Sequence, residues 1–371
     1  MSKRLTVYLA GLTLVACATL TPSIAFGSTD AADEVTADDA ISAIRNVASG
    51  TDEQIANPGD VEIGAANVTV ESDLGTVATV PLLEVAPIEI ETAELVDETG
   101  DIVQAAQSVT VSLPTTATGD SPEIGTDGSV TFPSASAAAT TVIPAGDGSV
   151  QFLTTIANSS AAERYVYDFG LPEGARLTVN EANGAVMGLD RDGGLIFVIA
   201  PAWALDADSN PVPTHYEVDD HTVTQVVEHR ASDTASYPIV ADPWMGMDLI
   251  ANYKWVGPTS AGNWKISVAV TATMGWVTSD VANYNGWPEL VTKVTRTSAF
   301  HLARLNSARA TYSQQWMCHA IGKAAIGIGT WLGVDGSPTW DLESWRPVLG
   351  QIDGRSTWQI AETMVQKRCN W

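Results

Sequence analysis

Basic residues are scarce in the first two thirds of the chain. Residues 28–242 contain 5 Lys and Arg against 36 Asp and Glu, a net charge of −31. A surface this acidic repels phosphate backbones, so we expect no nucleic acid partner. Residues 243–371 contain 11 Lys and Arg against 8 Asp and Glu, and they hold eleven of the twelve tryptophans. We therefore predict two physically different domains, with the boundary between Asp242 and Pro243.

Long apolar runs are also lacking. The longest, Leu5 to Ala16, is shorter than the roughly 20 residues that a membrane-spanning helix needs. It follows two basic residues and leads to a small-residue region that ends at Gly27, which is typical of a signal peptide at residues 1–27. We expect a secreted protein with no transmembrane segment in the mature chain. The alternative is a lipoprotein anchored through Cys17, because LVAC matches the sequence at which bacterial lipoproteins are cleaved and acylated.

Residues 28–60 are small and acidic, and we predict a flexible arm with one short helix in TADDAISAIRNVASG. Thr36 or Asp38 would cap the start of this helix, and Gly50 would end it. Its apolar stripe is Ile41, Ile44 and Val47.

Apolar and polar residues alternate from residue 61 to 242, as in NVTVES, IEIETA, SVTVSL, SVTFP, RLTVNE and LIFVIA. Glycine, Asp, Asn and Pro turns separate these segments, which indicates an all-β sandwich or a related layered fold. In RYVYDFGL the side chains of Tyr165, Tyr167 and Phe169 share one face of the predicted strand, and we place that face in the core.

Residues 243–371 combine strand and helix patterns. YKWVG and WKISVAVTAT predict paired strands, and residues 298–327 predict one long helix that lacks proline. A loop at 334–354 then leads to a closing helix at 356–369. The whole chain is thus predicted to be an α+β protein of two domains, with a small C-terminal α+β domain.

Several motifs resemble those of secreted actinobacterial proteins. YPIVADPW resembles the Tyr-Pro-Val-Val-Ala-Asp-Pro type sequence that ends a β-rich N-terminal module in that class. QQWMCHA, PTWDLESWRP and the terminal CNW resemble a C-terminal domain of unknown function from the same proteins. Trp371 replaces the final proline of that pattern, and AAIGIGTWLGVDG lengthens its middle. The resemblance implies secretion and two fold halves, and it implies no known activity.

The pair Cys318 and His319 suggests a catalytic thiol with its base. Adjacent helical residues point about 100° apart, however, so the two side chains cannot face each other. Cys318 and Cys369 each lie on an apolar stripe of a predicted helix, and in an exported protein we expect them to form a disulfide that closes the C-terminal domain.

No cofactor motif is complete. Gly322 and Lys323 lack the following Ser or Thr and the earlier glycine of a phosphate-binding loop. We expect no cofactor, and we interpret Gly322, Gly327 and Gly329 as positions of close helix packing or of a fraying helix end.

The loop that begins at Asp206 offers a weak calcium candidate. Asp206, Asp208, Asn210, Thr214 and Glu217 have the spacing of oxygen ligands in a calcium-binding loop. Pro211 stands where that loop needs glycine, so a plain turn between strands is the favoured interpretation and no metal is expected. We interpret His215, His221 and His229 as surface histidines, and a metal shared by His215 and His221 across a hairpin stays the alternative.

The segment TWDLESWRP holds the remaining candidates. If it is extended, Asp341, Glu343 and Trp345 share a face, and two carboxylates beside an aromatic ring are compatible with glycoside hydrolysis. Alternatively, Arg346 pairs with Glu343. We consider Asp341, Glu343, Trp345, Arg346 and His319 as possible binding residues. The tryptophans are more often core than sugar platforms, although a few at the rim could bind.

These patterns favour a non-enzymatic binding module at the cell surface or outside the cell. The acidic β-domain would serve as a stalk or scaffold, and the partner would be a cell-wall glycan or another surface protein. Two alternatives remain open. One is an antagonistic effector whose AAIGIGTWLG segment disturbs membranes, and the other is a glycoside-type hydrolase.

Overall fold

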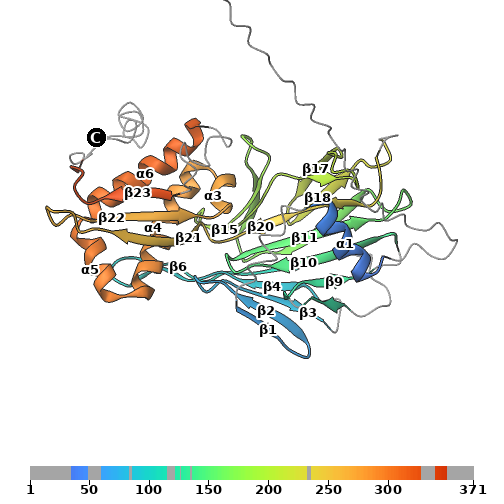
Figure 1. The fold of residues 1–371 in the computed structure, drawn as a ribbon, viewed down its shortest axis with the longest axis horizontal. Helices are drawn as coiled ribbons and strands as arrows, with labels where there is room; N and C mark the ends of the chain where they lie inside the picture. Colours follow the sequence, from blue (N-terminus) through green and yellow to red (C-terminus); the bar gives the residue numbers. More distant parts are fainter. Residues whose placement is uncertain are drawn as a thin grey trace, which may run out of the picture. The chain divides into compact units, whose positions relative to one another are not determined.

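The protein is described from a computed structural model (Figure 1), which covers residues 35–48, 60–82, 86–114, 122–125, 127–133, 136–231, 235–326 and 339–348. The predicted signal peptide, Cys17, the closing helix and Cys369 lie outside the described residues. Within the described residues, no helix is long and apolar enough to cross a bilayer.

The first large sheet is antiparallel and has eight strands. In spatial order they are β1 (Asp60–Ile63), β2 (Asn67–Glu71), β3 (Val77–Pro81), β4 (Ile88–Glu91), β7 (Ser108–Ser112), β12 (Arg164–Gly170), β18 (Thr222–Val227) and β17 (Thr214–Asp219). Strands β2, β4, β7 and β12 alternate buried and exposed residues, as predicted, because only one face of this sheet meets the core.

The second large sheet has ten strands. Its main path is β13 (Arg176–Val179), β14 (Val186–Leu189), β15 (Leu195–Ile199), β20 (Trp244–Gly246), β11 (Ser149–Ile156), β10 (Ala138–Pro144), β9 (Val130–Phe132) and β8 (Glu123–Ile124). Beside β11 lie β19 (Ile239–Ala241) and then β16 (Ala204–Leu205). Strand β20 lies beyond the predicted boundary at Pro243, yet it belongs to this sheet because it pairs with β11 and β15.

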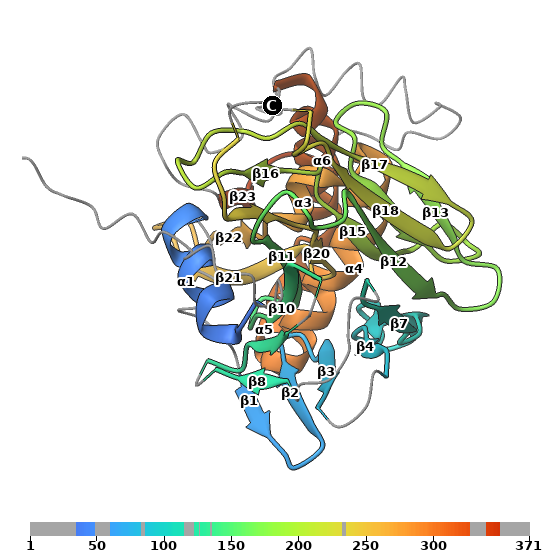
Figure 2. The same cartoon turned by 90° about the vertical axis from the view of Figure 1, so that its right-hand side faces the viewer.

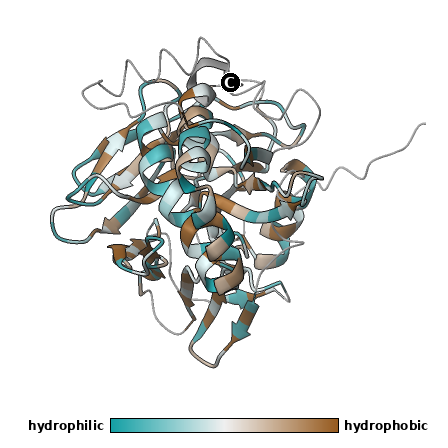
Figure 3. Cartoon of the chain, turned by 90° about the vertical axis from the view of Figure 1, so that its left-hand side faces the viewer, coloured by the Kyte–Doolittle hydropathy of each residue, from teal (hydrophilic) through white to brown (hydrophobic). Residues whose placement is uncertain are grey.

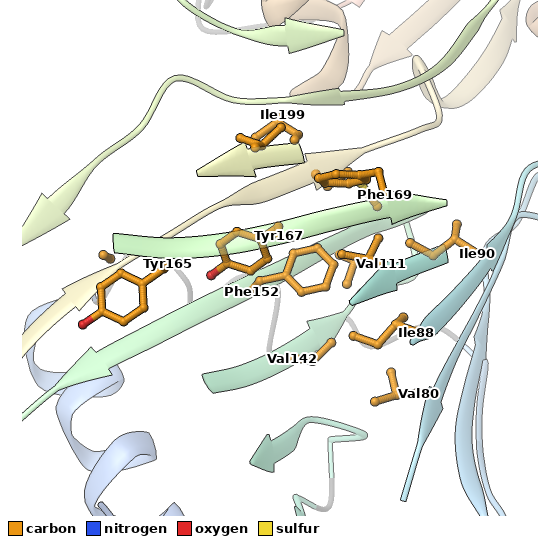
Figure 4. Packing of buried hydrophobic residues seen from close by; sticks show 14 of the residues in the cluster. Val80, Ile88, Ile90, Val111, Val142, Phe152, Tyr165, Tyr167, Phe169 and Ile199 are labelled. Carbon is orange, nitrogen blue, oxygen red and sulfur yellow. The ribbon is translucent and has the colours of Figure 1, made fainter. Parts of the chain in front are cut away.

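The two sheets share one apolar core, so the architecture is β-rich and consistent with the predicted sandwich. Figure 4 shows Tyr165, Tyr167 and Phe169 of β12 in this core, beside Phe152 of β11. All three β12 side chains are buried, which confirms the predicted face. The Phe152 and Tyr167 rings are tilted at a centroid distance of 5.9 Å.

Helix α1 (Ala37–Val47) covers the outer face of β10, β11 and β19 (Figure 1 and Figure 2). The hydroxyl of Thr36 caps it by accepting the backbone N–H of Asp39 at 3.2 Å, as predicted. Ile44 and Val47 pack against Leu153 of β11. The predicted short helix is therefore confirmed, and it packs on the β-rich fold; residues 28–34 and 49–59 of the predicted flexible arm lie outside the described residues.

The C-terminal part contains an antiparallel sheet of β21 (Ile250–Val256), β22 (Lys265–Val270) and β23 (Thr339–Glu343). The predicted pairing of the first two strands is confirmed, and β23 lies within the predicted loop. The helices of its described residues are α3 (Thr273–Trp276), α4 (Ser279–Thr297), α5 (Ala299–Ser307) and α6 (Arg309–Ile326). The predicted single helix is wrong: Ala308 leaves the helical conformation with φ −137° and separates α5 from α6.

A second apolar core joins this part to the sandwich. Val198 of β15 and Met187 of β14 point to it from the outer face of the second sheet, and Leu290 of α4 and Trp316 of α6 meet them from the other side. Strands β14 and β15 are consequently buried on both faces. Figure 3 shows hydrophobic and hydrophilic residues on the same helices, as expected when one side of a helix is buried.

Buried polar contacts cross the same junction. Asn285 of α4 accepts the backbone N–H of Leu195 at 2.9 Å, and Asn180 donates to the carbonyl of Trp276 at 2.9 Å. The short hairpin of β5 (Leu95–Val96) and β6 (Ile102–Gln104) reaches α4, where the Thr292 hydroxyl accepts the N–H of Val96. Residues 32–371 form one compact unit, and the division into two domains stays a prediction.

Candidate binding surface of the C-terminal part

A group of aromatic residues gathers around one arginine where β21 and α5 meet. Strand β21 and helix α5 are far apart in the sequence. Trp264, the residue just before β22, is the third contributor to the group. We call this group the aromatic–arginine surface, and its members are Tyr253, Trp255, Trp264, Phe300, His301 and Arg304.

Arg304 is the centre of this surface. Its guanidinium carbon lies 3.6 Å from the ring centroid of Trp264, 4.9 Å from that of Trp255 and 4.6 Å from that of Phe300. A guanidinium over aromatic faces is attracted by the ring quadrupole, which holds the arginine in place. Within the described residues Arg304 forms no salt bridge, so its charge is not neutralised by a neighbouring carboxylate.

The edge of the surface is ordered by a second set of contacts. The Tyr253 hydroxyl and His301 Nδ1 are 3.0 Å apart, and the His301 ring lies at 6.1 Å from Trp255. Phe300 is 67 % exposed, the largest value among the exposed large hydrophobic residues of the described chain. Exposed aromatic residues held beside arginine are the composition of protein interfaces rather than of ordinary surface.

Sequence reasoning missed Phe300 and Arg304. Their spacing of four residues on a helix puts both on one face, which is a readable signal. Their approach to Trp255 and Trp264 is a tertiary contact that no local pattern contains.

Asp341 and Glu343 share a face of β23, as the extended interpretation predicts, but each has its own partner. Asp341 accepts hydrogen bonds from Lys265 Nζ and Ser267 Oγ, both at 2.6 Å. Glu343 accepts from Arg346 Nε, which is the predicted alternative pairing. Each carboxylate is therefore held by its own neighbours on the sheet or in the following turn.

Trp345 and His319 do not join these carboxylates. Trp345 lies in the turn after β23 and is 42 % exposed. His319 stacks on Trp340 at a centroid distance of 5.3 Å, with Nε2 at 3.4 Å from the carbonyl of Asp341. Burial lowers the pKa of His319, so this imidazole is a packed, neutral ring on the core side of α6.

The calcium candidates are not brought together. Asp206 Oδ1 accepts the backbone N–H groups of Asp208 at 3.0 Å and Asn210 at 2.8 Å, which forms a turn closed by its own side chain. Glu217 lies on β17 and makes a bidentate pair with Arg164 of β12, at 3.0 and 2.5 Å. No group of three or more His, Cys, Asp or Glu in the described ranges could hold a metal.

His229 differs from the prediction of a surface histidine. It is 1 % exposed, with Nδ1 at 2.8 Å from the Tyr237 hydroxyl and Nε2 at 3.2 Å from the carbonyl of Ala162. The prediction failed because the loop after β18 folds back over this side chain. His215 and His221 are exposed, as predicted.

Cys318 is buried, as the apolar stripe predicts. Cys369 lies outside the described residues, so the disulfide stays a prediction. Among the described residues, no atom lies within 4 Å of a Cβ built at Gly322. Gly327 and Gly329, with most of AAIGIGTWLG, lie outside the described residues, so both interpretations of these glycines stay predictions.

Two buried carboxylates, Asp248 and Glu289, lie at the junction with the sandwich, and no local pattern predicts them. Asp248 accepts from Ser72 Oγ at 2.8 Å and Thr76 Oγ1 at 2.7 Å, and Glu289 accepts the backbone N–H of Ile250 at 2.7 Å. Burial raises the pKa of both, that of Glu289 to about 8, with the Asp248 charge adding to it and Lys293 opposing it. The cavity beside them, about 20 Å³, has room for about one water. We interpret this cluster as structural.

In comparisons with known proteins, no family model, no curated protein and no solved structure matches this chain.

Proposed function

We propose that the protein is an exported, non-enzymatic binding module that engages a protein partner through the aromatic–arginine surface. The observation that carries this proposal is the position of Arg304 over Trp255, Trp264 and Phe300, with its charge not paired by a described carboxylate. The β-rich part then serves as the scaffold on which this surface is displayed.

The geometry favours a protein partner over a glycan. A sugar platform needs an open ring face, and here the guanidinium already occupies one face of each of the three rings. Tryptophan and arginine are the residues most enriched among the energetic centres of protein interfaces. The cationic centre further selects a partner with acidic groups at its contact surface.

The separate engagement of Asp341 and Glu343 supports a binding role over glycoside hydrolysis. A hydrolase needs two carboxyl groups that flank one sugar bond. Asp341 is held by Lys265 and Ser267, whereas Glu343 is held by Arg346. These contacts tie the two groups into the sheet and its turn.

The test compares surface variants with a matched exposed aromatic residue. Mature wild-type protein, Phe300→Ala and Arg304→Ala are added to intact producing cells, and bound protein is quantified before and after protease treatment of the cells. Tyr284→Ala is the control, because Tyr284 is 57 % exposed on α4 and is not part of the surface.

We expect each surface variant to bind at least about tenfold more weakly, since the central residues of an interface each contribute about 1.4 kcal/mol or more. Tyr284→Ala should bind like wild type, and protease treatment should abolish binding. Equal binding of all variants would contradict the proposed surface. Binding that survives protease but is lost on digestion of the cell-wall glycan would show a glycan partner instead.

A further inference from the structure

The peptide bond between Asp242 and Pro243 lies inside the second sheet. It belongs to the short link from β19 to β20, and β20 is held between β11 and β15 (Figure 1). The same bond divides the acidic residues 28–242 from the tryptophan-rich residues 243–371, and it is the only Asp–Pro bond of the sequence.

An Asp–Pro bond is open to attack by the side chain of its own aspartate. The protonated carboxyl group supplies both the attacking oxygen and the proton that the departing nitrogen needs. The proline nitrogen belongs to a tertiary amide and accepts this proton more readily than other peptide nitrogens. In an unfolded chain the reaction therefore needs acid, because an ordinary aspartate ionises with a pKa of about 3.9.

The fold keeps the Asp242 carboxyl protonated without acid. The side chain is completely buried, and burial raises its pKa to about 8. The titratable side chains that face it are Tyr216 of β17 and Tyr167 of β12, and burial raises the pKa of both hydroxyl groups. Neither tyrosine carries a positive charge that would favour the ionised carboxylate.

The fold also holds this carboxyl beside the bond. Oδ1 of Asp242 accepts the backbone N–H of Trp203 at 2.9 Å and Gln225 Nε2 at 3.1 Å. The backbone N–H of Trp244, two residues further along the chain, also faces the carboxyl. The side chain thus folds back along the bond to Pro243, as in an Asx turn. Two reacting groups that are held together in this way react much faster than free ones.

We propose that the protein cuts its own chain between Asp242 and Pro243 at neutral pH. A carboxyl oxygen of Asp242 forms a bond to the carbonyl carbon of the same residue. The bond from that carbon to the Pro243 nitrogen breaks, and the carboxyl proton passes to this nitrogen. The five-membered anhydride left on Asp242 takes up one water when the sheet opens locally, which gives one fragment that ends at Asp242 and one that starts at Pro243.

The two fragments stay together after the cut. Strands β11 and β15 of the first fragment pair with β20 of the second, and the backbone N–H of Phe152 donates to the carbonyl of Pro243 at 2.8 Å. The second apolar core also contains residues of both fragments. The aromatic–arginine surface lies entirely on the second fragment, so the cut and the proposed binding are independent.

Denaturing electrophoresis and mass spectrometry measure the cut over time. Mature wild-type protein is kept folded at pH 6, unfolded in guanidinium chloride at pH 6, and unfolded in guanidinium chloride at pH 2. The unfolded sample at pH 2 sets the time scale, because its carboxyl is protonated without help from the fold.

We expect the folded protein at pH 6 to be cut at least as fast as the unfolded sample at pH 2. Unfolded protein at pH 6 should be cut about a hundredfold more slowly, since an ordinary aspartate is protonated in only about 1 % of molecules at that pH. The two fragment masses should add up to the mass of the intact chain plus one water. Both fragments should leave a gel-filtration column as one complex.

Two variants and one internal control identify the reacting groups. Asp242→Asn removes the acid, and Pro243→Ala removes the tertiary amide, so neither folded variant should be cut in the same period. The bond after Asp248 is the internal control, because Asp248 is also buried with a raised pKa but Leu249 follows it. The thermal unfolding midpoint of each variant is measured first.

A single cut between Asp242 and Pro243 in folded wild type, absent from Asp242→Asn, would support the proposal. Folded wild type that stays intact while the unfolded sample at pH 2 is fully cut would overturn it. Equal cutting of wild type and Asp242→Asn would also overturn it, because it would show the action of a contaminating protease.

Discussion

Gly286 of α4 lies directly against the indole of Trp316 on α6. A Cβ built on this glycine would overlap ring atoms of Trp316, whose own N–H donates to the carbonyl of Ala282 at 3.3 Å. The two helices can therefore pack this closely only because residue 286 has no side chain. Around Gly322 of α6, no atom of the described residues lies within 4 Å of a built Cβ.

We expect Gly286→Ala and Gly322→Ala to have opposite effects. Gly286→Ala should lower the free energy of unfolding by about 1–3 kcal/mol, because the tightly packed indole must move. Gly322→Ala should raise it by up to about 1 kcal/mol, because alanine favours the helix and its Cβ would meet no atom of the described residues. Urea unfolding followed by circular dichroism measures both values, and equal effects of the two substitutions would contradict this packing.

The same helix shows where sequence reasoning reaches its limit. Gly286 and Pro288 disfavour a helix, so α4 was not predicted, and its formation depends on packing in the second core and on the Thr278 cap. Half-buried strands such as β12 were predictable because burial of one face forces alternation. Strand β10 is buried on both faces and has no such signal.

The candidate surface was predictable only in its composition. The tryptophans of residues 243–371 were expected mostly in the core, with a few at a rim, and the helical spacing of Phe300 and Arg304 is local information. Arg304 reaches Trp255 from α5, which ends at Ala308 before α6 begins, and no glycine or proline marks that break.

Glu289 should make the protein less stable at high pH. Burial raises the pKa of Glu289 from 4.5 to about 8, so the folded state keeps a proton that the unfolded state has lost between these values. Stability is therefore fully present below about pH 4.5 and is lost as pH rises through about 8. Glu289→Gln retains an acceptor for the N–H of Ile250. It should make the free energy of unfolding fall less steeply as the pH rises, by up to about 1.4 kcal/mol per pH unit.

Urea unfolding of wild type and Glu289→Gln at several pH values between 5 and 9 measures this slope. Glu173→Gln is the control, because the side chain of Glu173 is 95 % exposed. Parallel pH profiles of wild type and Glu289→Gln would show that Glu289 does not hold the proton.

His229 should limit stability at the acid side. Burial lowers the pKa of His229 below 6.5, so protons bind preferentially to the unfolded state as pH falls through this region. Stability is present above pH 6.5 and is lost as the pH falls toward the pKa of the folded state. His229→Gln should make stability fall less steeply as the pH is lowered. His221→Gln, at an exposed position, should leave this fall in stability unchanged. Thermal unfolding midpoints between pH 4 and 7 measure the difference, and matching declines in wild type and His229→Gln would contradict it.

Asp242 should tolerate a neutral isostere and not an apolar one. Burial raises its pKa to about 8, and Oδ1 accepts the backbone N–H of Trp203 at 2.9 Å and Gln225 Nε2 at 3.1 Å. Asn keeps that oxygen and has no charge to bury, so the stability of Asp242→Asn should match that of wild type near pH 6 and exceed it above pH 8.

Asp242→Leu should lower the free energy of unfolding by about 2 kcal/mol or more at both pH values, because two buried donors lose their acceptor. Denaturant unfolding at pH 6 and 9 separates these cases: an Asn variant as unstable as the Leu variant would show that the native state needs the charged carboxylate.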